Sequence, residues 1–180
     1  MNLPNKLTIL RVLMIPFFLW VLLAQLFGEE WFQIAAAGIF LLASMTDMLD
    51  GYIARKHNLI TNFGKFMDPL ADKLLVCAAL IALVEMGRLP AWMVIVLISR
   101  EFIVVGFRMI AAEKNIVIAA DIWGKIKTST QMLMIVLLIL NNPMPVMQHM
   151  TQATVILSVA FSVISATEML YKNKDVLKES

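Results

Sequence analysis

Residues 47–72 read DMLDGYIARKHNLITNFGKFMDPLAD, and long apolar runs flank this stretch on both sides. Two aspartates, Asp47 and Asp50, stand at its start, and two more, Asp68 and Asp72, stand toward its end. The stretch is therefore expected to hold the polar link between two consecutive apolar helices, with two acids at the end of one helix and two at the start of the next.

The composition indicates that these helices lie in a lipid bilayer. Of the 180 residues, 61% are hydrophobic and 16% are charged, whereas soluble domains are about half apolar and about a quarter charged. A spanning helix needs about 20 residues, so the chain has room for about six spans. The sequence predicts an all-α integral membrane protein, one domain over residues 1–180. The spans are predicted at residues 7–27, 31–55, 66–86, 90–112, 119–141 and 146–171.

The cations are distributed unevenly over the predicted loops. With the N-terminus inside, 14 of the 15 Lys and Arg residues fall on or near the cytoplasmic side, and only Arg88 falls outside. Because inner loops carry the excess of Lys and Arg in membrane proteins, both termini are predicted to be cytoplasmic. The first apolar run is long for a signal peptide and no small-residue cleavage site follows before Gly28, so we expect it to be retained.

Helical spacing places the acids of each helix on one face. Asp47 and Asp50 are three residues apart, while Gly64, Asp68 and Asp72 are four apart and drift by only about 40° per step. Two antiparallel neighbours would bring four carboxylates into one volume, where they repel each other. Divalent cations relieve this repulsion, and carboxylate oxygens suit Mg²⁺ or Mn²⁺. Four carboxylates suit two ions, which can clamp a phosphoryl group between attacking and leaving oxygens.

A single acid in this stretch would have an ordinary structural explanation. Asp68, which precedes Pro69, could be the N-cap of a helix. Four acids at these spacings favour a binding site instead, because Gly51 and Gly64 remove side chains from the same faces and let a ligand approach the backbone.

The spacing D-x2-D-G-x2-A-R-x8-G-x3-D-x3-D matches in full the motif of the CDP-alcohol phosphotransferases, and the chain resembles that family. The resemblance implies a fold of six transmembrane helices, commonly a homodimer, with the active site open to the cytoplasm. It also implies an enzyme that moves a phosphatidyl or similar group from a CDP-linked donor to an alcohol and releases CMP.

Further strings favour the bacterial members that use sn-glycerol 3-phosphate as acceptor. These strings are PNKLTILR at residues 4–11, Ile15-Pro16, SRE at residues 99–101 and GKIKT at residues 124–128. The resemblance implies transfer from CDP-diacylglycerol to sn-glycerol 3-phosphate, giving phosphatidylglycerophosphate and CMP for anionic phospholipid biosynthesis in a bacterial plasma membrane. Membrane lipid and a second copy of the chain are expected partners, and nucleic acid is not.

The resemblance also assigns roles to the aspartates. Asp47, Asp50 and Asp68 are expected to ligate one metal ion, and Asp47, Asp68 and Asp72 a second. Asp72 is the expected general base, which takes the proton of the acceptor's C1 hydroxyl as that hydroxyl attacks the β-phosphorus. A base in this role must lie within hydrogen-bond reach of its proton.

The CDP donor is expected to contact small residues and cations. Gly51 and Ala54 would make room for the nucleotide, and Arg55 would reach a donor phosphate. Residues on the leading helix are further candidates, although a basic interfacial helix explains Arg11 about as well. The full donor set is Asp50, Gly51, Ala54, Arg55, Gly64, Asn5, Thr8 and Arg11.

Basic residues within the later spans point to the acceptor. Intramembrane cations are costly and normally face a cavity or a partner, and Arg and Lys bind a dianionic phosphate well. For Arg108 and Lys127, snorkelling to lipid headgroups is the competing explanation, and for Arg100 it is a structural pair with Glu101 or an aspartate. The candidates for the acceptor phosphate are Arg100, Arg108, Lys125 and Lys127.

Two alternatives to transfer onto sn-glycerol 3-phosphate stay open. One is a sister enzyme whose acceptor is inositol phosphate, serine or phosphatidylglycerol, which the aspartate motif does not distinguish. The other is a divalent-cation transporter, which would place its acids near mid-membrane on broken helices. The acids here are predicted at the inner helix ends, which favours the enzyme.

Overall fold

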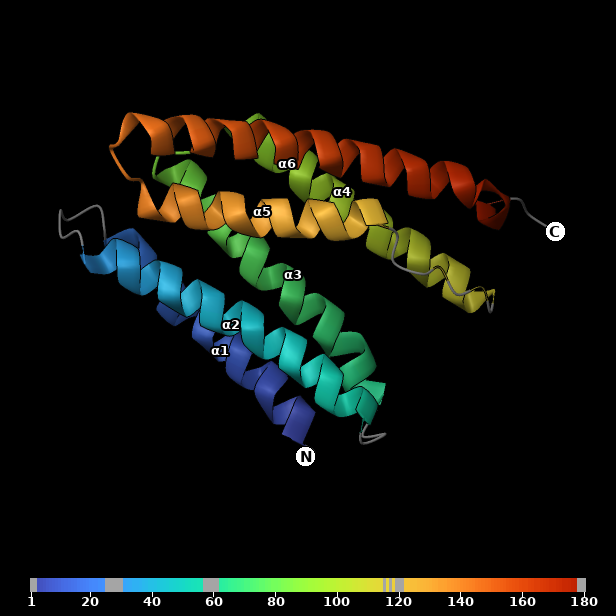
Figure 1. The fold of residues 1–180 in the computed structure, drawn as a ribbon. Coiled ribbons are helices and arrows are strands. Elements are labelled where there is room, and N and C mark those ends of the chain that lie inside the picture. The colour runs from blue at the N-terminus through green and yellow to red at the C-terminus, as the bar shows by residue number, and fades with distance from the viewer. Residues whose placement is uncertain are drawn as a thin grey trace. The chain divides into compact units, whose positions relative to one another are not determined.

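In the computed structural model all regular secondary structure is helical within the described residues, which are 3–24, 31–56, 62–114, 116, 118 and 122–177 (Figure 1). The α-helices are α1 (Leu3–Ala24), α2 (Trp31–Lys56), α3 (Asn62–Glu85), α4 (Ala91–Glu113), α5 (Ile122–Leu140) and α6 (Pro145–Lys172), followed by the 3₁₀-helix η2 (Lys174–Leu177). The predicted all-α fold with six helices is confirmed. The membrane topology and the single domain stay predictions.

Two helices begin earlier than the predicted spans. α1 begins at Leu3 instead of residue 7, and α3 begins at Asn62 instead of residue 66. The predictions followed the apolar runs, whereas the backbone hydrogen bonds of a helix extend equally through polar turns ahead of such a run. The predicted start of the fifth span, residue 119, lies outside the described residues.

The chain forms two compact units. The first comprises residues 1–89 and 138–141, and therefore α1, α2, α3 and the last residues of α5. The second comprises residues 90–137 and 142–180, and therefore α4, most of α5 and α6. Each unit has its own buried core.

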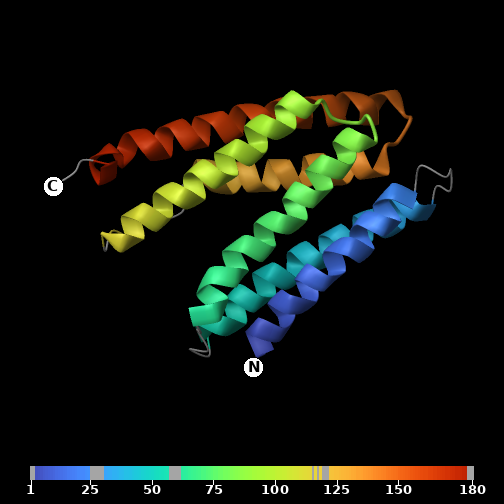
Figure 2. The ribbon, with the colours of Figure 1, turned by 180° about the vertical axis from the view of Figure 1, so that it is seen from behind.

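In the first unit, α1 packs against both α2 and α3, and α2 contacts α3 (Figure 2). Phe18 of α1 and Phe40 of α2 are fully buried, with ring centroids 5.8 Å apart. Ala36 and Ala43 of α2 are also fully buried. Small side chains of this kind let two membrane helices approach closely, so α1 is held firmly along the helix that carries Asp47 and Asp50.

In the second unit, α4 and α6 contact each other. Near their C-terminal ends, Val104, Phe107 and Ala111 of α4 form a core cluster with Met169 of α6 and Val176 of η2. Closer to the N-terminus of α6, the buried side chains are small and polar. They recur at helical spacing and are Thr154, Ser158, Ser162 and Ser165. The unit thus buries polar residues on α6.

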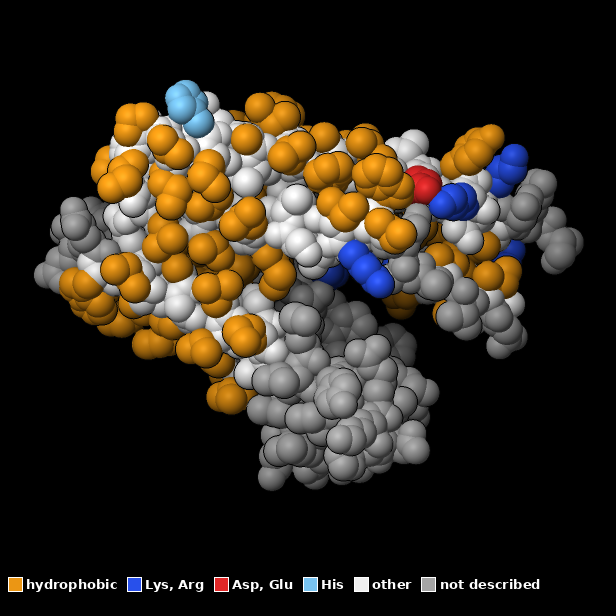
Figure 3. All heavy atoms as spheres, viewed as in Figure 1, with side chains coloured by type: hydrophobic (Ala, Val, Ile, Leu, Met, Phe, Trp, Pro, Cys, Tyr) orange, Lys and Arg blue, Asp and Glu red, His pale blue; other side chains and the backbone are white. Residues whose placement is uncertain are grey.

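Large apolar side chains point outward from both units. Figure 3 shows many hydrophobic side chains on the described surface. Trp20, Ile34, Ile81, Ile95 and Ile156 are each more than half exposed. Buried polar and outward apolar residues are the arrangement expected in lipid. Among the described residues, α5 and α6 are long and apolar enough to span a membrane.

Arg88 lies in the link between α3 and α4 and caps the end of α5. Its Nη1 donates hydrogen bonds to the carbonyl oxygens of Leu138 and Ile139, both at 2.9 Å. The last carbonyls of a helix have no partner within the helix, and a cation is favourable at that end. Burial lowers the pKa of the Arg88 guanidinium, although arginine stays protonated. The one cation predicted on the outer side therefore has a structural role.

Replacing Arg88 tests this cap. Arg88→Met keeps much of the side-chain length but leaves two part-buried carbonyls without their donor, so we expect a loss of about 1–3 kcal/mol in unfolding free energy. Denaturant unfolding in detergent micelles measures this loss. Lys174→Met, which removes an exposed cation, is the control and should change the stability little; equal stability of both variants would contradict the cap.

Candidate active site

The structure places the four aspartates on two helices of the first unit that contact each other. Asp47 and Asp50 lie in the last ten residues of α2, and Asp68 and Asp72 lie in the first eleven residues of α3. Both helices are continuous through these positions. The prediction that the acids sit on two consecutive helices is confirmed.

The start of α3 removes the simple structural explanation for Asp68. Because α3 begins at Asn62, Asp68 is its seventh residue. An N-cap residue stands just before the first helical turn, so Asp68 is not the N-cap of this helix. Pro69 consequently lies beyond the first turn, where its missing N–H removes a backbone hydrogen bond.

The side chains of the motif lie outside the described residues, so their contacts stay predictions. This holds for the four aspartates, for the predicted donor contacts on α2 and α3, and for those on α1. The residues concerned are Asp47, Asp50, Gly51, Ala54, Arg55, Gly64, Asp68, Asp72, Asn5, Thr8 and Arg11.

The donor set nevertheless fits a divalent cation. Four carboxylate residues occur on two contacting helices, and hard oxygen ligands suit Mg²⁺ or Mn²⁺. Among the side chains that the structure describes, no group of three or more His, Cys, Asp or Glu could hold a metal ion.

The second unit contains a buried group of charged residues. Glu101 of α4 is 4% exposed and Lys127 of α5 is 3% exposed, and their side chains form an ion pair. Arg100 Nη1 lies 3.4 Å from Glu101 Oε1, and Arg100 Nη2 donates a 2.6 Å hydrogen bond to Ser165 Oγ of α6. The group therefore joins all three helices of the unit.

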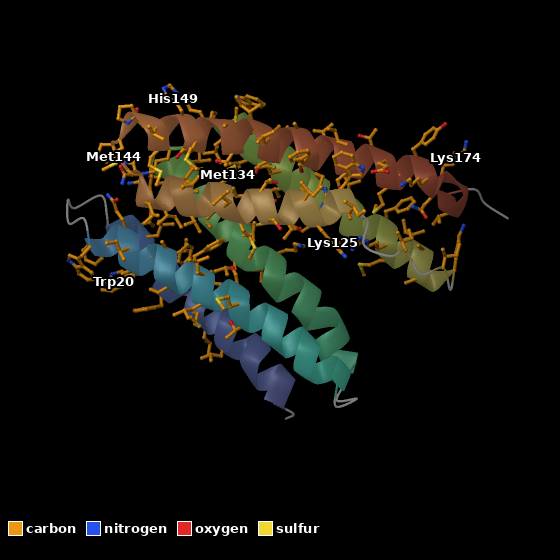
Figure 4. The ribbon with its side chains drawn as sticks, viewed as in Figure 1. Trp20, Lys125, Met134, Met144, His149 and Lys174 are labelled. Atoms are coloured by element: carbon orange, nitrogen blue, oxygen red, sulfur yellow. The ribbon has the colours of Figure 1, made fainter. Side chains whose placement is uncertain are left out.

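This geometry decides between the explanations for the cations. Lys127 does not snorkel, because its ammonium is buried and paired with Glu101. The predicted pair of Arg100 with Glu101 is present. Arg108 and Lys125 are exposed, and Figure 4 shows Lys125 on the first turn of α5. Of the four predicted phosphate ligands, the structure thus brings Arg100 and Lys127 together.

Two buried polar residues of the second unit, Ser165 of this group and Gln131 on α5, were not predicted from the sequence. Ser165 carries no signal of its own, since it lies among several serines of an apolar helix. Gln131 is buried on α5, one turn beyond Lys127, and its Nε2 has no hydrogen-bond partner among the described residues. The only sign of Gln131 in the sequence was a single glutamine within an apolar run.

Comparison with known proteins adds independent information. The family model of CDP-alcohol phosphatidyltransferase matches residues 1–164. A Bacillus subtilis protein named CDP-diacylglycerol–glycerol-3-phosphate 3-phosphatidyltransferase is 47% identical, over 99% of this chain and 98% of its own length. A Rickettsia felis protein of the same name is 40% identical over 78% of this chain and 76% of its own length. A Mycobacterium tuberculosis protein named probable phosphatidylglycerophosphate synthase is 38% identical over 87% of this chain and 75% of its own length.

Substituting Asp47 tests the metal site without an activity assay. Asp47→Ala removes a carboxylate expected to contact both ions, so Mn²⁺ binding should weaken by at least about tenfold, since one lost charge-assisted contact costs about 1.5–3 kcal/mol. Isothermal titration with Mn²⁺ measures the affinity. Glu85→Ala removes an exposed carboxylate at the far end of α3 and serves as the control; unaltered Mn²⁺ affinity in Asp47→Ala would contradict the assignment.

Proposed function

The chain belongs to the CDP-alcohol phosphatidyltransferase family, and we propose that it transfers the phosphatidyl group of CDP-diacylglycerol to sn-glycerol 3-phosphate. The products are phosphatidylglycerophosphate and CMP, which places the enzyme in anionic phospholipid biosynthesis. The observation that carries this function is the 47% identity, along 99% of the chain, to a relative named for this reaction.

We place this reaction at the cytoplasmic face of a bacterial plasma membrane. The outward apolar side chains of both units and the two apolar helices α5 and α6 support a membrane location. The distribution of 14 of the 15 cations toward one side supports cytoplasmic termini. A homodimer, which the family resemblance implies, is part of the same proposal.

The aspartates are proposed to hold two divalent cations. Asp47, Asp50 and Asp68 would hold one, and Asp47, Asp68 and Asp72 the other. Bound Mg²⁺ or Mn²⁺ would neutralise charge on the reacting phosphates. The position of the four acids on two contacting helices, α2 and α3, supports a cation site, because carboxylates close together would repel each other without cations.

Asp72 is proposed as the general base. It would accept the proton of the acceptor's C1 hydroxyl, whose oxygen then bonds to the β-phosphorus of the donor. The bond from that phosphorus to the oxygen bridging it to CMP breaks, and CMP leaves. Phosphoryl transfer depends mainly on positioning and charge stabilisation, so one carboxylate in reach of the hydroxyl is sufficient as a base.

The remaining motif residues are proposed to bind the donor. Gly51 and Ala54 lie on α2 with Asp47 and Asp50 and would leave space for the nucleotide, and Arg55 would contact a donor phosphate. The other proposed donor contacts are Asp50, Gly64, Asn5, Thr8 and Arg11.

The acceptor phosphate is proposed to bind the cations of the second unit. Arg100 and Lys127 are the principal ligands, because Lys127 is buried, Arg100 is partly buried, and both contact Glu101. Arg100 Nε is buried and has no hydrogen-bond partner among the described residues, so a donor is available for a phosphate oxygen. Arg108 and Lys125 are exposed and are proposed as secondary contacts.

An acceptor assay tests the function. The purified protein with CDP-diacylglycerol and Mg²⁺ or Mn²⁺ should release CMP on addition of sn-glycerol 3-phosphate, and not with inositol phosphate, serine or phosphatidylglycerol. Radiolabelled acceptors followed into lipid measure this. Turnover with one of the other acceptors alone would overturn the proposed acceptor, and metal flux into proteoliposomes without CMP release would overturn the enzyme.

Asp72→Asn tests the base. The amide cannot accept the hydroxyl proton, so kcat should fall by about 10²–10⁴-fold, while CDP binding in the presence of Mn²⁺ should be largely retained. Steady-state kinetics and titration with CDP measure the two effects. Glu85→Gln makes the same chemical change at an exposed position of α3 and should leave kcat intact. Near-normal turnover by Asp72→Asn would show that another group is the base.

A further inference from the structure

A single carboxylate stands between two buried cations in the second unit. Glu101 Oε1 pairs with Lys127 Nζ and lies 3.4 Å from Arg100 Nη1. At least 89% of each of these three side chains is removed from the surface, since their exposed fractions are 6%, 4% and 11%. Ser165 fixes the far side of the Arg100 guanidinium through its 2.6 Å hydrogen bond.

The carboxylate reduces the destabilisation that two neighbouring cations cause inside the unit. Two buried like charges repel each other, and each loses its hydration. A shared carboxylate offsets both costs and restricts two long, flexible side chains to one arrangement. Glu101 therefore holds the side chains of Lys127 and Arg100 near each other.

The contacts with Glu101 and Ser165 do not use all the donors of Arg100. A guanidinium has five N–H groups. Arg100 Nε is buried and lacks a partner among the described residues. A buried donor without a hydrogen bond destabilises the folded protein. This points to an acceptor group that the bound ligand would supply.

We propose that Glu101 is a positioning residue of the acceptor site. It holds the Lys127 ammonium and the Arg100 guanidinium where the phosphate of the acceptor binds, and it does not contact the substrate itself. This inference rests on the proposed function, in which these two cations bind the acceptor phosphate.

Removing Glu101 has two opposing electrostatic effects. The loss of a negative charge would by itself favour phosphate binding, whereas the loss of the shared partner lets the two cations separate. The second effect is expected to dominate, because charge-assisted hydrogen bonds weaken steeply once their distance and angle deviate from the optimum.

The test is a kinetic comparison of Glu101→Gln and Glu101→Asp with the wild-type protein. In Glu101→Gln, which keeps the shape but not the charge, KM for sn-glycerol 3-phosphate should rise at least about tenfold, the equivalent of one lost charge-assisted contact. The kcat and the KM for CDP-diacylglycerol should stay within about threefold of wild type, since a group that acts only on acceptor binding shifts KM alone. Glu101→Asp should recover part of the acceptor affinity.

Glu113→Gln is the matched control, because it neutralises an exposed carboxylate of the same helix and should leave all three constants unaltered. An unchanged or lowered KM for the acceptor in Glu101→Gln would overturn the proposal. A parallel rise in KM for both substrates would also overturn it, because the loss of a purely structural ion pair would weaken the binding of both.

A second comparison covers the case in which Glu101→Gln does not fold. Replacing both charges, Glu101→Met with Lys127→Met, avoids an unpaired buried charge. Added to Lys127→Met, the Glu101→Met change should raise the acceptor KM further, because Arg100 then loses its positioning partner, while the KM for CDP-diacylglycerol should stay within about threefold. An unchanged acceptor KM relative to Lys127→Met would overturn the proposal.

The wild-type assay separates this inference from the proposed function. If the wild-type protein releases CMP only with another phosphorylated acceptor, the proposed acceptor fails, and the same KM comparison is made with that compound. The positioning role is then upheld or overturned by the same selective rise in KM.

Discussion

Charge placed inside an apolar helical bundle must be neutralised, and this requirement governs both candidate sites. In the second unit a carboxylate of the protein offsets part of the positive charge: Glu101 pairs with Lys127 and lies beside Arg100, and Ser165 accepts a hydrogen bond from the guanidinium. In the first unit the motif brings four acids, including Asp47 and Asp72, onto two contacting helices. Carboxylates in such numbers repel each other, and divalent cations are the proposed partners that neutralise them.

The two proposed sites would bind the anionic groups of the two substrates in different ways. Acids with bound metal suit the phosphates of the donor and the activation of a hydroxyl. Buried Arg and Lys suit the phosphate of the acceptor. A carboxylate such as Glu101 keeps the two cations ordered before the substrate arrives, which reduces the conformational entropy lost on binding. The proposed reaction needs both kinds of site, because both of its substrates are anionic.

The sequence predicted the helices well because apolar runs in a membrane protein are long and separated by short polar links. It predicted the starts of α1 and α3 less well, since the first helical turns contain residues such as Lys6 and Asn62 that do not belong to an apolar run. The placement of the acids on two helices followed directly from their spacing. The side of the membrane on which each helix end lies is still a prediction. The same holds for the contacts of the aspartates.

Contacts between residues far apart in the sequence were beyond pattern analysis. The capping of Leu138 and Ile139 by Arg88 links residues 50 and 51 positions apart, and no local signal marks it. Likewise, the burial of Lys127 and the exposure of Lys125 depend on how α5 is rotated within its unit. Two cations two residues apart lie on different faces of a helix, but the sequence does not reveal which face is buried. Family membership came from the motif alone, and the similarity to a Bacillus subtilis relative over 99% of the chain agrees with it.

The central claim is that the four aspartates form a metal site at which the donor reacts. Anomalous diffraction from crystals grown with Mn²⁺ and CDP-diacylglycerol measures this most directly. The account predicts two anomalous peaks between α2 and α3, within coordination distance of Asp47 and Asp68, with the donor's phosphates beside them. An absence of anomalous density there, at Mn²⁺ concentrations that support turnover, would contradict it.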